Sequence, residues 1–192
     1  MRWAAVSVVI YSFFVGCGTT QTRKTPAMPK RVVIETDKGD IEVELFVDEA
    51  PKTCANFVRL VRQHYYSNLP FFRVVKGMLV ETGCPRGDGS GGPGWTVPLE
   101  ITSHKHLPGA VVMERKMGQE GSHGSQFYIC CGKLPERDGK FCVFGCVTGG
   151  MDVVRKIEDV EVETYFIGGE PFHRPKNSPK VLRIRVIEEK GR

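Results

Sequence analysis

The 192-residue sequence lacks a concentration of charge of either sign. Lysine and arginine together exceed aspartate and glutamate by only five, and the basic residues are spread along the chain. Proteins that bind nucleic acid or a membrane surface through charge usually carry a basic patch or run. We therefore expect no nucleic-acid partner. The length and the 41% hydrophobic content predict one soluble globular domain with a core of its own.

The sequence also lacks an apolar run of the roughly 20 residues that a membrane-spanning helix needs. Its longest early uncharged run, residues 3–15, follows a short positive start and predicts the apolar part of a signal peptide. That run leads to Phe14-Val15-Gly16-Cys17, which resembles a bacterial lipobox, although the lipobox usually has Leu where this chain has Phe14. We predict a signal peptide over residues 1–17 with lipidation of Cys17. An ordinary signal peptide and a short uncleaved anchor stay open.

Residues 18–30 lack a periodic apolar pattern and contain two prolines, which predicts a flexible tether. The folded domain is then expected over residues 31–192. This layout predicts a protein of the cell envelope, either a membrane-anchored lipoprotein or a periplasmic protein, rather than a cytoplasmic one.

Motifs for metals and nucleotides are missing as well. Cys142 and Cys146 are four residues apart and have no second zinc half-site, and most of the six cysteines after Cys17 are expected to be small buried hydrophobes. So many cysteines would suit a cytoplasm better than an oxidising compartment, which conflicts with the signal peptide. A G-x-G-x-x-G match at residues 87–92 is followed by Pro-Gly-Trp instead of a helix. We expect no metal and no cofactor, and we expect His104, His106 and His123 to lie exposed in loops.

What is present is mainly a β pattern. Residues 31–46 alternate apolar and polar around a turn and predict a β-hairpin. Residues 48–66 change to helical spacing, with Pro51 in the first turn and two acidic residues, Asp48 and Glu49, at the positive end. A second short helix is predicted to begin near Gly150.

Further strands are predicted over 71–75, 79–82, 97–101, 110–113, 126–131, 141–147 and 181–187, and a long loop over 162–179. Several short strands with turn signals and only two helices are typical of a closed antiparallel barrel. The fold class is therefore mainly β.

One residue does not fit its strand. In the stretch PFFRVVKGM, residues 70–78, Arg73 stands among apolar residues and should share a strand face with Phe71 and Val75. A guanidinium stays charged and is rarely buried without a partner. Either Arg73 lies on an edge strand with its side chain in solvent, or it has a functional role at this position.

Three ordered segments decide between these readings: FFRVVKGMLVETGCPRGDGSGGPG (71–94), GSQFYI (124–129) and DGKFCVFGCV (138–147). They resemble the cyclophilin signature, and the likeness covers roughly residues 31–188. It implies an eight-stranded antiparallel barrel closed by two helices. It also implies peptidyl-prolyl cis–trans isomerase activity, with proline-containing peptides and unfolded protein segments as partners and no cofactor.

The resemblance makes Arg73 the catalytic arginine and makes Gln126 the glutamine that holds the substrate backbone. Phe71 and Phe127 match aromatic residues of the motifs. The apolar pocket for the proline ring would be formed by Met78, Leu79 and Tyr128, where the family usually has Phe, Met and Phe.

Other family positions carry bolder changes. A pocket leucine becomes Arg137, a histidine becomes Phe141, and a rim tryptophan becomes Glu136. The glutamine that orients the catalytic arginine becomes Glu81, which we expect to clamp Arg73 with both carboxylate oxygens. Glu114 and Arg115 replace small or amide residues beside the subsite for the residue that precedes proline.

Two functions follow from this set. The first is an isomerase that accelerates the folding of exported or envelope proteins. The second is a membrane-tethered module that grips a proline-containing loop but turns over little. The kept pair, Arg73 and Gln126, favours the enzyme, whereas Glu114 and Arg137 favour the binding module.

Overall fold

The computed structural model describes residues 28–115 and 121–188. The predicted signal peptide, the lipobox cysteine Cys17 and most of the predicted tether lie outside these ranges. The last three residues of that tether, 28–30, are part of the folded domain. Met28 packs against the core, Pro29 is buried, and the Lys30 carbonyl accepts a hydrogen bond from the Leu45 amide.

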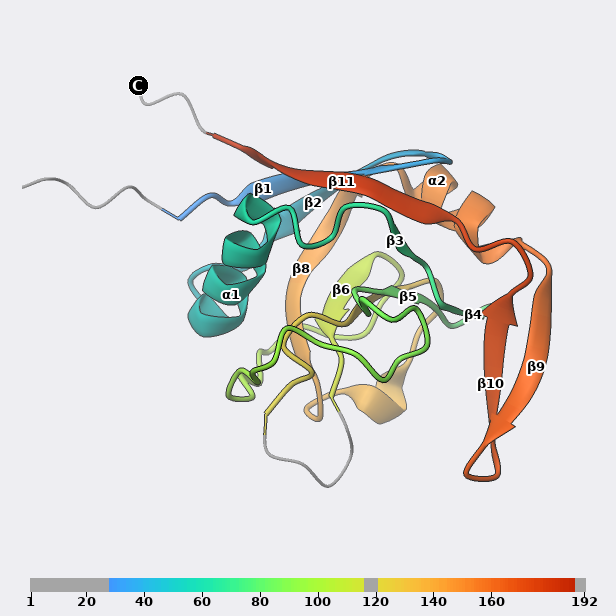
Figure 1. Cartoon of the computed structure of the whole chain (residues 1–192). Coiled ribbons are helices and arrows are strands. Elements are labelled where there is room, and N and C mark those ends of the chain that lie inside the picture. The colour runs from blue at the N-terminus through green and yellow to red at the C-terminus, as the bar shows by residue number, and fades with distance from the viewer. Residues whose placement is uncertain (1–27, 116–120, 189–192) are drawn as a thin grey trace, which may run out of the picture.

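A single curled antiparallel sheet dominates the part of the chain that the structure describes (Figure 1). Its spatial order is β3-β11-β1-β2-β8-β6-β7-β5-β4. The strands are β1 (Arg31–Thr36), β2 (Gly39–Leu45), β3 (Leu69–Pro70), β4 (Arg73–Val75), β5 (Leu79–Thr82), β6 (Ala110–Met113), β7 (Phe127–Cys130), β8 (Cys142–Gly149) and β11 (Lys180–Ile187).

The two ends of this sheet order are joined by the chain itself. β3 and β4 are separated only by Phe71 and Phe72, so together they form one bent strand. The Phe71 amide donates to the Pro179 carbonyl next to β11, and the Phe72 amide donates to the Glu81 carbonyl on β5. Counted in this way the curled sheet has eight strands, which agrees with the predicted mainly β fold of antiparallel strands.

The two α-helices of the described ranges lie at opposite ends of the barrel (Figure 1). α1 (Pro51–Arg62) begins with proline as predicted, but neither Asp48 nor Glu49 lies in its first turn. Instead the Glu100 carboxylate accepts hydrogen bonds from the Lys52 and Thr53 amides, at 3.0 and 2.7 Å. α2 (Met151–Glu158) follows Gly150, whose φ of 84° is a conformation that favours glycine. A 3₁₀ turn, η1 (Pro135–Arg137), precedes β8.

Strand alternation gives the sheet two apolar faces. Along β7, Phe127 and Ile129 point into the barrel, where they pack with apolar side chains of both helices. Tyr128 and Cys130, the alternate residues, point outward and join a second cluster with Leu79, Val112, Leu134, Phe141 and Val143. The candidate site lies over this outer cluster.

Two sequence predictions about the remaining segments are wrong. Residues 97–101 form no strand, because Glu100 caps α1 instead of pairing in a sheet. Residues 162–179 are not a loop: they contain a hairpin of β9 (Val162–Ile167) and β10 (Glu170–Pro175). Its turn is Gly168-Gly169, and both glycines have positive φ, as a two-residue hairpin turn requires.

The six cysteines of the described ranges are free thiols, and five of them are buried, as predicted. Burial raises the pKa of Cys54, Cys130 and Cys131 to about 12 and that of Cys142 to about 11. Thiols that stay protonated are poor nucleophiles and resist oxidation. Within the described ranges, the helices are too short or too polar for any of them to cross a bilayer.

Candidate functional site

Arg73 lies at the centre of the candidate site, directly opposite Glu81 in the β4–β5 pair. Its Nη1 is 3.3 Å from Glu81 Oε2, and 26% of the arginine side chain is exposed against 4% of the glutamate. The contact is therefore single, not the two-oxygen clamp that was predicted. One guanidinium edge is held from within the protein, while part of the group still faces the groove.

The strand bend explains why an arginine can stand in this apolar stretch. Phe71 was expected to share a face with Arg73, but the bend between β3 and β4 sends Phe71 into the barrel together with Val74. Phe72 is buried as well and stacks on Phe172 of the β9–β10 hairpin, with ring centroids 6.4 Å apart. Arg73 therefore reaches the groove, and Phe72 contributes to the wall of the same cavity.

Arg137 occupies the place where an apolar proline pocket was expected. Its guanidinium carbon lies 5.1 Å from the ring centroids of both Tyr128 and Phe141. Its Nη1 is also 3.8 Å from Glu114 Oε2, and both side chains are mostly buried. The two rings form an aromatic floor where the pocket of Met78, Leu79 and Tyr128 was expected, but a charged group covers this floor, and Tyr128 is fully buried beneath that group.

The two carboxylates of this cluster affect each other. Burial, and then the nearby charge of Glu114, raise the pKa of Glu81 to about 8, against the lowering effect of Arg73. Burial also raises the pKa of Glu114. At neutral pH, Glu81 is therefore largely protonated, and the positive charge of Arg73 is only partly offset.

Gln126 precedes β7 and is buried beside the glycine-rich loop. Its Nε2 donates to the carbonyl oxygens of Gly89 and Gly91, at 3.0 and 2.5 Å. The side chain thus fixes the loop that forms one wall of the groove. A role in holding substrate backbone is compatible with this position, since Gln126 lines the same cavity as Arg73.

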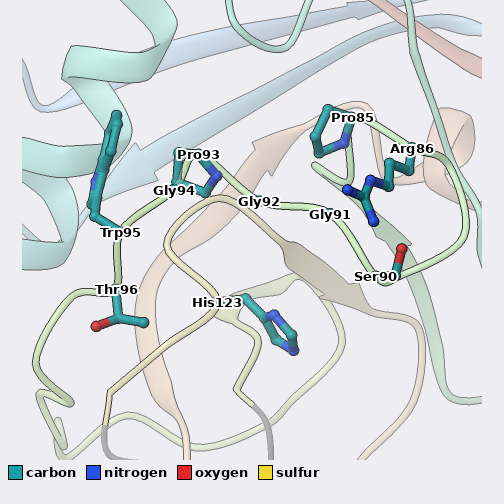
Figure 2. A pocket seen from close by; sticks show the side chains of 10 residues that line it. All are labelled: Pro85, Arg86, Ser90, Gly91, Gly92, Pro93, Gly94, Trp95, Thr96 and His123. Atoms are coloured by element: carbon teal, nitrogen blue, oxygen red, sulfur yellow. The ribbon is translucent and has the colours of Figure 1, made fainter.

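That central cavity has a volume of about 260 Å³ and is lined by Phe72, Arg73, Glu81, Gly89, Glu114, Arg115, His123, Gln126, Arg137, Phe141 and Phe172. A second cavity of about 340 Å³ adjoins it across His123. Figure 2 shows this second cavity, with Trp95 and Thr96 at one end, Arg86 and Ser90 at the other, and His123 below the loop. Both cavities lie along the glycine-rich loop and share His123, and together they are called the groove below.

Comparison with known proteins identifies this arrangement. Residues 31–186 match the family described as cyclophilin-type peptidyl-prolyl cis–trans isomerase/CLD. The chain belongs to the cyclophilin family. A peptidyl-prolyl cis–trans isomerase of Synechococcus elongatus is 42% identical over 161 residues, which cover 83% of this chain and 97% of that protein. The isomerase CYP71 of Arabidopsis thaliana is 38% identical over 165 residues, 84% of this chain but only 25% of that protein.

A crystal structure supports the same assignment. The cyclophilin-type isomerase of Cryptosporidium parvum, crystallised in the presence of the dipeptide Ala-Pro, superposes with a TM-score of 0.72 at 28% identity. The superposition covers 83% of this chain and 99% of that one. The cyclophilin fold expected from the three sequence motifs is therefore confirmed.

The other residues that the cyclophilin resemblance singled out differ in their positions relative to the groove. Arg115 lines the central cavity, and its Nη1 donates to the Lys140 carbonyl at 3.2 Å. Phe71, Leu79 and Phe127 are fully buried, so in this structure they support the site from below and have no surface for a peptide. Met78 lies partly buried at the β4–β5 turn, packed against the outer cluster rather than in the groove.

Two histidines of this cyclophilin site were misjudged from the sequence. His123 was expected in an exposed loop, but it is only partly exposed and lines both cavities. His106 was expected in an exposed loop, but it is buried, and its Nδ1 lies 2.9 Å from Asp138 Oδ1. Its ring stacks behind Tyr128, with centroids 6.3 Å apart. Asp138 belongs to the DGK motif, so that motif also fixes the back of the pocket.

Proposed function

We propose that this cyclophilin is a peptidyl-prolyl cis–trans isomerase in which Arg73 stabilises the twisted peptide bond. The observation that carries the proposal is a permanently charged guanidinium, held at one edge by Glu81 and exposed to the groove at another. Rotation about a peptide bond has a barrier of about 18–20 kcal/mol because amide resonance is lost. A fixed cationic donor beside the proline nitrogen lowers that barrier, since the lone pair is localised on the twisted nitrogen but is delocalised into the carbonyl group in the planar amide.

The substrate class is supported by a relative rather than by a ligand. The Cryptosporidium protein was crystallised in the presence of Ala-Pro. In our proposal, proline-containing segments of unfolded proteins bind along the groove, with the proline above Tyr128 and Phe141 and the preceding residue toward Glu114 and Arg115.

Exchange spectroscopy on an Ala-Pro peptide tests the proposal. We expect the protein to accelerate cis–trans exchange in proportion to its concentration, without any added metal or nucleotide. An unchanged exchange rate at protein concentrations that saturate the peptide would contradict isomerase activity.

The position of Arg137 favours a second candidate, a tethered module that binds proline-containing loops with little turnover. A proline ring reaches Tyr128 and Phe141 only if the guanidinium leaves its place over both rings. If that displacement is costly, the groove binds peptide backbone without deep proline insertion. Peptide affinity combined with an unchanged exchange rate would identify this second function.

We further propose that the clients are exported or envelope proteins and that the chain is anchored through lipidated Cys17. The support comes from the signal-like residues 1–17 and from the slow proline isomerisation that limits the folding of many proteins. The raised pKa of the buried thiols also makes the cysteine content compatible with an oxidising compartment.

Labelling of cells with radioactive palmitate tests the anchor. We expect label on the wild-type chain and none on the Cys17→Ser variant, with both proteins exported. Equal labelling of the two, or accumulation of the wild type in the cytoplasm, would refute the localisation without affecting the isomerase proposal.

A further inference from the structure

The β9–β10 hairpin stands beside the barrel next to β4, close to the candidate site (Figure 1). Its register pairs Phe172 with Tyr165 and Glu170 with Ile167, so these four side chains share one face. That face turns toward Arg73, since Phe172 stacks on Phe72, which precedes Arg73. Phe166, the neighbour of Ile167, points to the opposite face and is 73% exposed.

A third cavity, of about 590 Å³, lies between this hairpin face and the barrel. It is lined by Arg73, Asp88, Gly89, Ser90, Ile167, Glu170, Pro171, Phe172 and Arg174. Arg73, Gly89 and Phe172 also line the central cavity, and Ser90 also lines the loop cavity of Figure 2. The three cavities therefore share lining residues, and they lie next to one another around Arg73 and the glycine-rich loop.

The lining of the third cavity predicts the kind of side chain that it accepts. Its two basic residues, Arg73 and Arg174, are balanced by the acidic residues Asp88 and Glu170. The cavity therefore has no net charge that would favour an acidic or a basic substrate residue. The apolar surface comes from Phe172 and Ile167 of this hairpin face and from Pro171 beside them, and Ile167 is 58% exposed. The volume lies within the range of about 300–1,000 Å³ typical of small-ligand pockets. Such a cavity suits one or two large apolar residues.

We propose that this hairpin forms a subsite for the substrate residues that follow the proline, with a preference for large apolar side chains. This inference rests on the proposed isomerase function, which sets the direction in which the peptide runs along the groove. The subsite for the preceding residue is expected at Glu114 and Arg115, toward the loop cavity. A chain that crosses Arg73 with its proline then leaves on the hairpin side.

Two peptides of equal composition test the preference: acetyl-Ala-Ala-Ala-Pro-Leu-Phe-amide and acetyl-Leu-Phe-Ala-Pro-Ala-Ala-amide. Both have alanine before proline, so they differ only in where the apolar pair lies. We expect the wild-type protein to bind the first peptide about fivefold to tenfold more tightly, because burial of about half of one large apolar side chain supplies a difference of that size. Dissociation constants come from chemical-shift titration and need no turnover.

Paired variants assign the preference to the hairpin face. Ile167→Ser removes apolar surface from the cavity, and Phe166→Ser makes the same type of change one residue away on the other face. We expect Ile167→Ser to bring the affinity ratio of the two peptides to within about twofold, and Phe166→Ser to leave the ratio as in the wild type. Both residues are exposed, so both variants should fold.

The outcomes separate this inference from the isomerase proposal. Equal affinities of the wild type for the two peptides, or equal effects of the two serine variants, would overturn the hairpin subsite even if exchange is catalysed. The expected affinity ratios without accelerated exchange would support the subsite and contradict the isomerase. Tighter binding of the peptide with the upstream pair would overturn the proposed direction of the chain.

Discussion

Strands β5 and β7 have an inner face that packs in the apolar core and an outer face on which charged groups lie among apolar side chains. Inside the barrel, Val80, Phe127 and Ile129 meet other apolar side chains. On the outside, Glu81 and Tyr128 meet Arg73 and Arg137, and burial raises the pKa of Glu81 to about 8. Burial of charged groups is unfavourable, so the outer face lowers the free energy of unfolding, whereas the apolar packing of the inner face raises it. The comparison teaches that stability and the proposed chemistry reside on alternate residues of the same strands.

The largest expected effect is on the inner face. Ile129→Ala leaves a cavity in the barrel core and should lower the free energy of unfolding by about 2–5 kcal/mol. Chemical denaturation measures this change. Because Ile129 has no surface in the groove, exchange catalysis by the folded variant should remain within about twofold of the wild type. A large loss of catalysis with an unchanged unfolding free energy would break the division between the faces.

Arg73→Ala is the largest change expected on the outer face. Removal of a preorganised donor typically costs about 10²–10³ in rate, and we expect a fall in the catalysed exchange rate of that order. The unfolding free energy should change much less than in Ile129→Ala, since Arg73 is partly exposed and Glu81 is largely protonated at neutral pH. Exchange spectroscopy and denaturation on the same sample check both statements.

Arg137→Leu sharpens the comparison by making the outer pocket apolar. A proline ring would no longer need to displace a guanidinium from Tyr128 and Phe141, so peptide affinity should rise about threefold to tenfold. Arg155→Leu is the matched control, because Arg155 also pairs with a buried glutamate, Glu158, but on α2. An equal rise in both variants, or no rise in Arg137→Leu, would show that Arg137 does not restrict the pocket.

Glu81→Gln has the smallest expected effect at neutral pH, a change in turnover of less than about tenfold, because the neutral amide resembles the protonated acid. The pH dependence is more informative. As pH rises through about 8, Glu81 ionises and offsets the charge of Arg73, so wild-type turnover should fall. Turnover of Glu81→Gln should stay flat across that range.

The same residue affects stability with a definite sign. The pKa of Glu81 is raised from 4.5 to about 8 in the folded state, so its contribution is fully present below pH 4.5 and is lost as pH rises through 8. Thermal melts should therefore show Glu81→Gln gaining stability over the wild type as pH increases from 4.5 to 9. A constant difference across that range would contradict the raised pKa.

Much of the fold could be predicted because local and global signals agree. Alternation marked β1 and β2, helical spacing with Pro51 marked α1, and three ordered motifs identified the family. The β9–β10 hairpin was missed although it has a usable signal, since Gly168-Gly169 follows the apolar run Tyr165-Phe166-Ile167. Residues 170–179 are rich in proline and polar side chains, and this composition led to the prediction of a loop instead.

The errors at the site depend on tertiary contacts that no local pattern contains. The bend that sends Phe71 inward arises because Phe71 and Phe72 hydrogen-bond to different strands. The cap of α1 comes from Glu100, 47 residues further along the chain than Thr53. The stacking of Arg137 depends on Tyr128 and Phe141 meeting in space. The sequence singled out several residues that line the central cavity, such as Arg73 and Gln126, but it did not show that Arg137 would cover the two rings.

The central claim is that Arg73 acts on the twisted bond rather than on peptide binding. Its most direct test is to measure the catalysed exchange rate and the dissociation constant for one Ala-Pro peptide, with wild type and Arg73→Ala side by side. We predict a rate loss of about hundredfold with a dissociation constant within about threefold, as expected for a group whose interaction forms mainly in the transition state. Equal losses in rate and affinity, or a rate that survives the substitution, would contradict the account.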